Sequence, residues 1–296
     1  MKLARNLVKA VKNPRKAVKR LSLILKERLF WEKYYSRVRE PKIAGFVPHA
    51  SKNIIDLITK SLSDNGFNVV PFRVDVEDYR TYLKKADYRN DYYSENFPEK
   101  SLEHYVAAKL LDLRDNDIYI DVANENSPTP GIYHKLYGCT VYRQDLAFPE
   151  GLHGNTIGGD AASMPLENEF ASKLALHCSF EHFENDSDMN FVREAGRVLK
   201  RGGKLCIAPF YLFDRYVIQT DPTVLPGNGL PFEDDAVLYC AKGWRNRHGR
   251  FYDVPHLISR VRDNLGDLNL TIYVLQNEKE VDASCHLKLI GLFEKR

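Results

Sequence analysis

Three aspartates follow strand-like stretches in the middle of the chain. Asp121 lies in IYIDVANENSPTPG, Asp145 in TVYRQDL and Asp160 in NTIGGDA. A carboxylate at the end of a parallel strand can accept hydrogen bonds from ribose hydroxyls or from the amino group of adenine. Each aspartate alone is a weak signal, because aspartate is common where strands end. Their order and spacing, 24 and 15 residues apart, predict a mononucleotide-binding site.

The stretch HCSFEH concentrates groups that could transfer protons. His177 and His182 are candidate catalytic bases, because the unperturbed pKa of histidine, near 6.5, suits proton transfer at neutral pH. Each also has a plain structural interpretation, His177 as a hydrogen-bonded core residue and His182 as a helix-start or packing residue. Cys178 and Glu181 complete a possible ligand set, but the H-E-x-x-H spacing is absent, so no metal is expected.

The stretch GWRNRHGRFYDVPH (243–256) is rich in arginine and aromatic residues. Guanidinium groups bind phosphate bidentately and aromatic rings stack on sugars or bases, which suits a phosphorylated or sugar-nucleotide acceptor. The alternative is a solvated loop with salt bridges to the acidic remainder of the chain. The candidate substrate-binding residues are Tyr211, Trp244, Arg245, Arg247, Arg250 and Tyr252.

Strands and helices alternate through the region that holds these residues. Strands are predicted at 118–123, 140–146, 173–180 and 204–210, and helices at 101–113, 130–138 and 189–203. This alternation predicts a parallel, doubly wound α/β sheet, whose ligands bind at the carboxyl ends of the strands. A helix at 254–266 and strands at 268–276 and 285–295 follow, and the last two strands, joined without a helix, predict an antiparallel edge.

The chain divides into three predicted parts. Residues 1–40 form a basic helical extension, residues 41–105 a cap, lid or small βαβ-like subdomain, and residues 106–296 the main domain. In the middle part the pattern predicts a strand at 43–47, a helix at 51–66 and a strand at 69–74. Its tyrosines, in a packed cap or lining a pocket, are Tyr79, Tyr82, Tyr88, Tyr92 and Tyr93.

Two blocks of the main domain resemble a known family. GDAASMPLENEFASKLALHCSFEHF (159–183) resembles the third and fourth strands of class I S-adenosylmethionine-dependent methyltransferases of the type 11 group. REAGRVLKRGGKLCIAPF (193–210) resembles their next helix, double-glycine turn and fifth strand. The resemblance covers roughly residues 100–295. It implies a Rossmann-like methyltransferase sheet, S-adenosylmethionine as the cofactor and methyl transfer as the reaction.

The first loop departs from the family pattern. The family usually carries D-x-G-x-G-x-G here, which aligns with Asp121, Ala123, Glu125 and Ser127, so all three glycines are missing. Glycine permits a positive φ and a close approach of the backbone to the cofactor. Ala123 is tolerated if its φ is ordinary. Two interpretations of Glu125 stay open: its carboxylate contacts the cofactor ammonium, or it fills the pocket and prevents binding.

The remaining roles are those that the resemblance implies. Asp145 would bind the ribose hydroxyls, and His177 would lie beside the sulfonium. Because the leaving group of a sulfonium needs no acid, catalysis requires alignment of the acceptor and a base if the acceptor is a hydroxyl, for which His177 and His182 are the candidates. The residues expected at the cofactor are Asp121, Ala123, Glu125, Asn126 and Ser127 at the methionine end, Asp145, Asp160 and Ala161 at the nucleoside, and His177.

Composition limits the class of protein. Hydrophobic residues make 44% of the chain and charged residues 28%, and the apolar runs are far shorter than the ~18 residues of a membrane span. The five cysteines are scattered and form no C-x-x-C pair, which argues against a disulfide framework or a zinc knuckle and favours a reducing cytoplasm. The N-terminus lacks the apolar region of a secretory signal.

The basic charge is confined to one segment. Residues 1–40 hold 13 Lys or Arg against 3 Glu, whereas the remaining residues carry 30 basic and 37 acidic groups. Apolar residues at helical spacing predict a basic amphipathic helix over residues 1–30, with a break near Pro14. It is either packed on its own domain, or contacts the inner membrane face as a peripheral anchor. RNA contact and a transit peptide are weaker alternatives.

These features predict a cytoplasmic methyltransferase that O-methylates a sugar or other small acceptor in glycan or secondary metabolite biosynthesis. A non-catalytic, methyltransferase-like scaffold is the alternative that Glu125 favours. An RNA methyltransferase is less attractive, because the body of the chain is acidic. The sequence gives no oligomeric state.

Overall fold

A computed structural model of the chain describes residues 14–88, 96–224 and 232–296. The chain forms two compact units, Met1–Val47 with Ile218–Gly249, and Pro48–Val217 with Arg250–Arg296. These boundaries differ from the division expected at residues 40 and 105. The physical reason is strand β2 (Asn68–Phe72), which pairs in parallel with β12 (Leu268–Leu275) and so joins the expected cap to the main sheet.

The larger unit is built on a nine-stranded sheet with the order β2-β12-β13-β8-β7-β3-β4-β6-β5. Neighbours β8, β7, β3, β4 and β6 run parallel, so their carboxyl ends lie at one edge. Strand β13 runs antiparallel to both β8 and β12. The remaining bounds are β3 (Ile118–Val122), β4 (Thr140–Asp145), β5 (Gly151–His153), β6 (Thr156–Gly158), β7 (Ala171–His177), β8 (Leu199–Ala208) and β13 (Leu289–Lys295).

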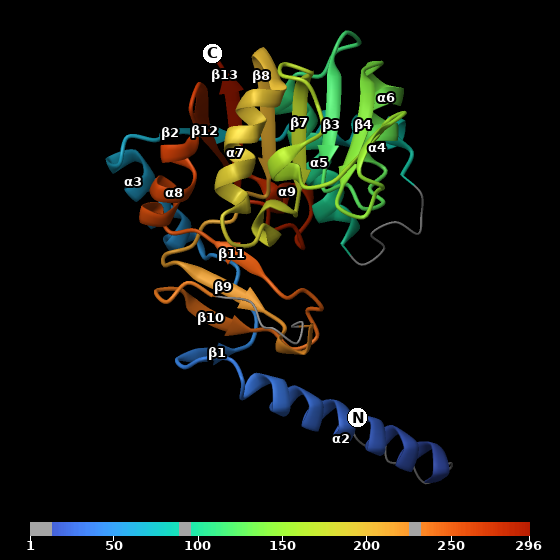
Figure 1. Cartoon of the computed structure of the whole chain (residues 1–296), viewed down its shortest axis with the longest axis vertical. Coiled ribbons are helices and arrows are strands. Elements are labelled where there is room, and N and C mark those ends of the chain that lie inside the picture. The colour runs from blue at the N-terminus through green and yellow to red at the C-terminus, as the bar shows by residue number, and fades with distance from the viewer. Residues whose placement is uncertain (1–13, 89–95, 225–231) are drawn as a thin grey trace. The chain divides into compact units, whose positions relative to one another are not determined.

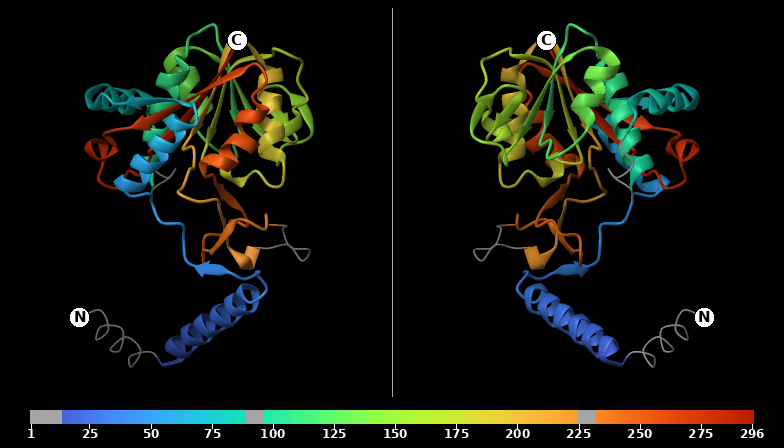
Figure 2. Two further views of the ribbon diagram at one scale, coloured as in Figure 1. Left: turned by 90° about the vertical axis from the view of Figure 1, so that its left-hand side faces the viewer. Right: turned by 90° about the vertical axis from the view of Figure 1, so that its right-hand side faces the viewer.

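Helices cover both faces of this sheet (Figure 2). One face carries α3 (Lys52–Asp64), α7 (Ser187–Val198) and α8 (Val254–Arg260), and the other α4 (Val76–Ala86), α5 (Phe97–Leu111) and α6 (Thr129–Tyr137). In Figure 1 α7 crosses in front of the strands and α5 lies behind them. Side chains of β3 alternate between the two layers, Ile120 packing with the first set and Tyr119 with the second. The predicted doubly wound methyltransferase-type sheet with antiparallel C-terminal strands is therefore confirmed.

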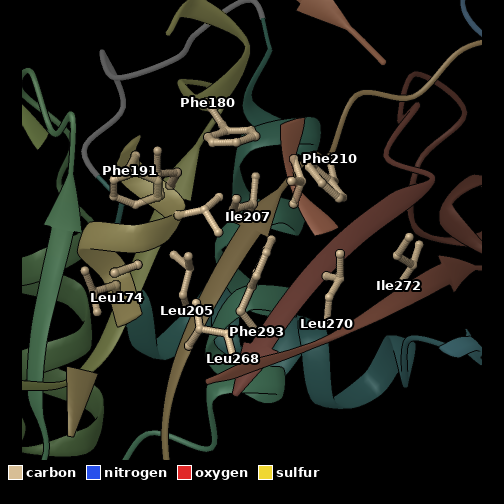
Figure 3. Close-up of a cluster of buried hydrophobic side chains, with 14 of the residues drawn as sticks. Leu174, Phe180, Phe191, Leu205, Ile207, Phe210, Leu268, Leu270, Ile272 and Phe293 are labelled. Atoms are coloured by element: carbon tan, nitrogen blue, oxygen red, sulfur yellow. The ribbon is translucent and has the colours of Figure 1, made fainter. Parts of the chain in front are cut away.

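Buried aromatic and aliphatic side chains fill the space between the sheet and the first set of helices. Leu205 and Ile207 point from β8 into a cluster that Phe293 of β13 completes (Figure 3). Phe180, after β7, packs against Phe210 with ring centroids 6.0 Å apart. This core holds the carboxyl ends of β7 and β8 in place, and the candidate site lies at those ends.

Three elements differ from their prediction. The helix expected to reach residue 203 ends at Val198, because Leu199 is fully buried and pairs with Ala171 at the start of β8. Strand β13 lies inside the sheet, and β2 forms the edge beyond β12. A short helix, α9 (Glu278–Val281), separates the last two strands, which were expected to follow one another directly.

A second, four-stranded sheet belongs largely to the smaller unit, with the order β1-β10-β9-β11. Its strands are β1 (Lys42–Ala44), β9 (Val217–Thr220), β10 (Val237–Cys240) and β11 (Gly249–Phe251). Strand β1 runs parallel to β10. The buried Asp221 accepts hydrogen bonds from the backbone N–H groups of Thr223 and Gly243, and so fixes the loops beside β9.

The N-terminal part of the smaller unit is α2 (Pro14–Tyr35). Pro14 is its first residue, and the predicted helical positions before it lie outside the described residues. Side chains on one stripe of α2 are exposed rather than packed: Val18 is 65%, Leu21 58%, Leu25 57% and Leu29 69% exposed. Within the described residues no helix is both long and apolar enough to span a bilayer.

Candidate active site at the carboxyl ends of the parallel strands

The loop after β3 has the backbone of a glycine loop without the glycines. Ala123 has φ 53° and Glu125 φ 51°, both in the left-handed region. The condition under which alanine would be tolerated at position 123, an ordinary φ, is therefore not met. Left-handed backbone costs roughly 1–2 kcal/mol for a residue with a Cβ, and hydrogen bonds offset it: Glu125 N–H donates to Asp145 Oδ2 at 2.7 Å and Ala123 N–H to Gln144 Oε1 at 3.1 Å.

Asn124 is the loop residue that turns inward. Its side chain is only 3% exposed, and Nδ2 donates to Asp121 Oδ2 at 2.6 Å. Its other amide atom, Oδ1, is buried and accepts no hydrogen bond from the described residues. Glu125 and Asn126, which were expected at the cofactor, are exposed. A buried acceptor left open in this way calls for a donor from outside the chain.

Asp121 lies below this loop in β3 and is 2% exposed. Tyr119 donates its hydroxyl to Asp121 Oδ1 at 2.7 Å. Burial raises the pKa of Asp121 to about 6, although its hydrogen bonds from Tyr119 and Asn124 oppose the shift. The carboxyl group is thus held where a cationic ligand group would favour its ionised form.

Asp145 is the last residue of β4, and Asp160 follows β6, the next strand of the sheet. Asp145 Oδ1 accepts the N–H of Ala147 at 2.8 Å, so each carboxylate oxygen holds one backbone donor and keeps a second lone pair. Leu146, directly after it, is 76% exposed. Asp160 caps a short 3₁₀ helix through Oδ1 and Ala162 N–H, 2.9 Å apart, while Ala161 is buried beside it.

Gln144 ties these strand ends together. Its backbone carbonyl accepts Asn124 N–H at 2.8 Å, and its Nε2 donates to the carbonyl of Gly159 at 2.6 Å. The loops that carry Asp121, Asp145 and Asp160 are therefore joined by one fully buried side chain. Two of the three aspartates that the sequence singled out lie in adjacent strands, Asp121 in β3 and Asp145 in β4, and Asp160 follows β6, the next strand of the sheet.

His177 ends β7, the strand on the other side of β3. Its Nε2 lies 3.8 Å from Asp121 Oδ1, and its ring packs edge-on against His104 with centroids 4.7 Å apart. Neither ring nitrogen has a hydrogen-bond partner among the described residues. Burial lowers the pKa of His177 to about 3. The imidazole is neutral near pH 7 and weakly basic, which opposes its predicted role as a catalytic base.

His182 lies farther along the same loop, in a short 3₁₀ helix (Phe180–His182). Its side chain is 34% exposed and Nε2 lies 3.7 Å from Glu181 Oε1. The assignment of His182 as a base stays a prediction. Among the described residues no three His, Cys, Asp or Glu side chains are grouped as metal ligands, and all five cysteines are free thiols.

Arg250 and Tyr252, predicted to bind the acceptor, are instead buried structural residues. Arg250 is 0% exposed and donates to the carbonyls of Phe183 and Asn185 at 2.9 and 3.1 Å. Tyr252 is 1% exposed and donates its hydroxyl to Asp188 at 2.6 Å. Their polar groups are engaged within the fold, which leaves them unsuited to an acceptor.

The other predicted acceptor residues divide between the two units. Tyr211 follows β8 in the larger unit, half-buried, with its hydroxyl 3.6 Å from Cys178 Sγ. Trp244, Arg245 and Arg247 belong to the smaller unit. Trp244 packs on Gly249 so closely that a Cβ there would lie 2.5 Å from its ring. A role of these three residues in acceptor binding stays a prediction.

Helix α5 brings polar residues to the site that the sequence pattern had treated as plain helix. Glu103 and His104 are both fully buried, and Lys100 donates to Glu103 Oε2 at 3.0 Å. Cys178 Sγ donates to Glu103 Oε1 at 3.3 Å, which joins α5 to the end of β7. The available signal was the charged EH pair inside the otherwise apolar LEHYVAAKLL.

A cavity of about 560 Å³ lies at the opposite end of the sheet, beside the last turn of α7 and the end of the antiparallel β13. Its charged side chains bond one another: Lys295 Nζ lies 3.4 Å from Glu169 Oε1 and 3.9 Å from Asp267 Oδ2. This cavity shares no residue with the strand-end site.

Residues 129–207 match the sequence model of the methyltransferase domain family. Over these residues the chain is similar to a methyltransferase domain. The match starts at α6 and ends in β8, so the domain match includes Asp145, Asp160 and His177, whereas the glycine-poor loop precedes it. The resemblance and the enzyme class expected from the sequence are confirmed. No curated protein sequence matches the chain.

Several solved structures match the chain at low identity and with TM-scores below 0.5. The 1,6-didemethyltoxoflavin N1-methyltransferase of Burkholderia thailandensis is 10% identical with a TM-score of 0.48, over 84% of this chain and 92% of its own. The geranyl diphosphate C-methyltransferase of Streptomyces coelicolor A3(2) is 12% identical with a TM-score of 0.42, over 84% and 100%. YcgJ of Bacillus subtilis is 16% identical with a TM-score of 0.42, over 66% and 98%.

Proposed function

We propose that this methyltransferase uses S-adenosylmethionine to methylate a hydroxyl group of a small molecule, with a sugar or glycan intermediate as the first acceptor class to test. The observation that carries the proposal is the strand-end edge itself. A left-handed loop, a buried open acceptor on Asn124 and a carboxylate with free lone pairs on Asp145 lie on adjacent strands.

The residues present fit this cofactor. Asn124 Oδ1 and the carboxylate of Asp121 offer acceptors for its ammonium group, and the left-handed backbone at Ala123 substitutes for the family glycine. Asp145 would accept the ribose hydroxyls, with Asp160 and Ala161 placed for the adenine. Leu146, 76% exposed beside Asp145, offers an apolar surface to the base. Ser127 would border the methionine end.

The cofactor supplies an electrophilic methyl group and leaves as a neutral thioether, so no acid is required. The chain must bind the cofactor, align the acceptor oxygen in line with the carbon–sulfur bond and take up one proton. Neutral His177 beside Asp121 adds no positive charge near a sulfonium, which favours binding of that cation. Helix α5 packs against β7 and β8 and buries Glu103 and His104 beside His177, which keeps water from that part of the site.

We also propose that α2 contacts an anionic membrane surface from the cytoplasmic side. Val18, Leu21, Leu25 and Leu29 form an exposed stripe at spacings of three and four residues. The helix sequence PRKAVKRLSLILKERLFWEKYY holds seven basic and two acidic residues. Apolar side chains and lysines on one exposed helix are the features of a peripheral membrane helix.

Calorimetric titration with S-adenosylmethionine tests the cofactor site. Asp145→Asn should weaken binding about 10- to 100-fold, because it removes a charged acceptor worth about 1.5–3 kcal/mol. Asp56→Asn, on the exposed face of α3, is the matched control and should bind like the wild type. If the folded wild type does not bind but Glu125→Gly does, Glu125 closes the pocket and the scaffold function replaces the enzyme.

A labelled-methyl assay tests the acceptor. Transfer from S-adenosylmethionine to a panel of sugars and glycan intermediates should label at least one hydroxyl. A protein that binds the cofactor and labels none of them remains a methyltransferase, but the glycan acceptor is then excluded.

A further inference from the structure

A buried polar cluster lies where α5 crosses the ends of β7 and β8. Glu103 is 0% exposed, and both of its carboxylate oxygens accept hydrogen bonds from Lys100 Nζ, at 3.2 and 3.0 Å. Cys178 Sγ, one residue after β7, donates to Glu103 Oε1 at 3.3 Å and lies 3.6 Å from the hydroxyl of Tyr211. We call these four residues the α5 cluster.

The α5 cluster adjoins the proposed cofactor site. His104, next to Glu103 on α5, packs against His177, and its Nε2 lies 3.1 Å from Thr129 Oγ1 at the start of α6. His177 in turn lies 3.8 Å from Asp121. The order across the strand ends is therefore the β3 loop, then His177, then the α5 cluster. This order places the cluster on the far side of His177 from the β3 loop.

The loop after β7 is built for a ligand that the chain does not supply. Cys178 has φ 50°, a left-handed conformation rare for a residue with a Cβ. Buried Ser179 Oγ, Glu181 Oε2 and both ring nitrogens of His177 have no hydrogen-bond partner among the described residues. Strained backbone and unsatisfied buried polar atoms gather at functional sites. A polar acceptor in this position would satisfy them.

The electrostatics of the cluster suit proton transfer at neutral pH. Burial raises the pKa of Glu103 to about 7, the charge of Lys100 opposes the shift, and Glu99 on the same helix adds to it. Burial alone would lower the pKa of Lys100, but the charges of Glu103 and Cys178 and the hydrogen bonds to them together outweigh burial and hold that pKa above its usual value. Burial also raises the pKa of the Cys178 thiol and of the Tyr211 hydroxyl, so both stay protonated. Glu103 is thus the group of the cluster that exchanges a proton near pH 7.

We propose that Glu103 is the general base of the methyl transfer and that the α5 cluster binds the acceptor hydroxyl. This inference rests on the proposed methyltransferase function and adds its base and its acceptor side. The acceptor O–H proton passes to Glu103, the oxygen lone pair forms the new O–CH₃ bond, and the pair of the broken C–S⁺ bond remains on sulfur. Lys100 orients the carboxylate. The cluster reaches the surface through Lys100, 15% exposed, and half-buried Tyr211.

The test separates binding from transfer in Glu103→Gln and in the control Glu99→Gln on the same helix. Calorimetry should show S-adenosylmethionine bound equally by both variants and the wild type. With labelled S-adenosylmethionine and glycerol, glucose and rhamnose as hydroxyl probes, the wild-type rate should rise with pH through about 7. Glu103→Gln should lower that rate about 10²- to 10⁴-fold and flatten the pH profile. Glu99→Gln should keep the rate above pH 7 and move the rise of the profile to lower pH, because the charge of Glu99 raises the pKa of Glu103.

Glu103→Gln alone leaves Lys100 buried without its partner and could prevent folding. The double variant Lys100→Met with Glu103→Gln is the control for this, since removing a whole buried ion pair is tolerated better than removing one partner. It should bind the cofactor and remain inactive. Wild-type rate and pH profile in either Glu103 variant would overturn the assignment of the base. A wild type that binds the cofactor but labels ethylamine and none of the hydroxyl probes would overturn the hydroxyl acceptor. Absence of cofactor binding by the wild type would instead refute the proposed function.

Discussion

At the scale of single residues, the loop after β3 shows how a glycine loop can be replaced. Ala123 and Glu125 hold positive φ angles because Gln144 and Asp145 fix their N–H groups. The conformation is thus stabilised by partners from the next strand rather than by the freedom of glycine. The left-handed backbone that glycine would permit is retained although all three glycines are absent.

The strain at Ala123 makes a stability prediction. Ala123→Gly should raise the free energy of unfolding by about 0.5–1 kcal/mol, because relief of a left-handed alanine exceeds the added freedom of glycine in the unfolded chain. Urea unfolding monitored by circular dichroism measures the change. Ala162→Gly, where φ is not positive, should destabilise the protein instead. A loss of stability in Ala123→Gly would contradict the left-handed assignment.

Much of the candidate site could be predicted from residue types, but its inward-facing members could not. Asp145, Asp160 and His177 follow strands, and a strand end can be read from its apolar pattern. The glycine-motif alignment directed attention to Ala123 and Glu125, whereas the left-handed turns point Asn124 inward. The contacts of Glu103 depend on how α5 crosses β7, which no local pattern specifies.

At the scale of elements, α7 is joined to Arg250 of β11 and to α8 by buried charges. Asp188 on α7 contacts Arg250 at 3.0 Å, Arg260 at 2.7 Å and the hydroxyl of Tyr252 at 2.6 Å. Both Asp188 and Arg250 have fully buried side chains. The network holds the helix that follows the HCSFEH loop, so it positions the site without contacting a ligand.

Breaking this network should be strongly destabilising. Asp188→Asn leaves Arg250 buried without a counter-charge, which costs about 3–5 kcal/mol. Asp186→Asn, at the exposed start of the same helix, should have an effect within about 0.5 kcal/mol. Urea unfolding at pH 7 measures both. Equal stability of the two variants would contradict a buried network.

The same network predicts a pH dependence. Burial would raise the pKa of Asp188, but hydrogen bonds from Arg260 and the charge of Arg250 outweigh burial and hold it below 3.8. A carboxylate with a lowered pKa in the folded state contributes stability that is present above the unfolded value and lost as the pH falls through the folded value. The loss in free energy of unfolding caused by Asp188→Asn should therefore stay constant at neutral pH and become smaller only below pH 3.8. Unfolding curves across this range test the sign.

The elements themselves were largely predictable, because apolar periodicity distinguishes strands of five to seven residues from longer helices. Their boundaries were less so. Leu199 continues the helical pattern of α7, yet pairing with Ala171 places it in β8. The pairing of β2 with β12 brings together residues about 200 positions apart in the sequence. No local pattern predicts this pairing, because it depends on how the whole sheet assembles.

At the scale of the whole molecule, the proposed membrane contact of α2 rests on how charge is distributed along the chain. The basic residues of α2 suit an anionic surface, and the acidic remainder disfavours RNA. Vesicles containing phosphatidylserine should bind the full chain, and added salt should weaken binding. Leu25→Glu should weaken it about 10- to 100-fold, given about 1.5–3 kcal/mol for a buried leucine.

Leu57→Glu on α3, 65% exposed in the wild type, is the matched control and should leave vesicle binding unchanged. Equal loss in both variants would mean that binding is non-specific. Binding to RNA in preference to the vesicles would contradict a membrane role for α2.

The most direct test of the central claim is amide hydrogen exchange with and without S-adenosylhomocysteine. The proposed site predicts slowed exchange in the loop at 123–127, after Asp145 and in HCSFEH, with no change at Leu265 and Gly266 in the cavity at the opposite end of the sheet. Protection confined to that cavity, or none at the strand ends, would contradict a cofactor site built on Asn124 and Asp145.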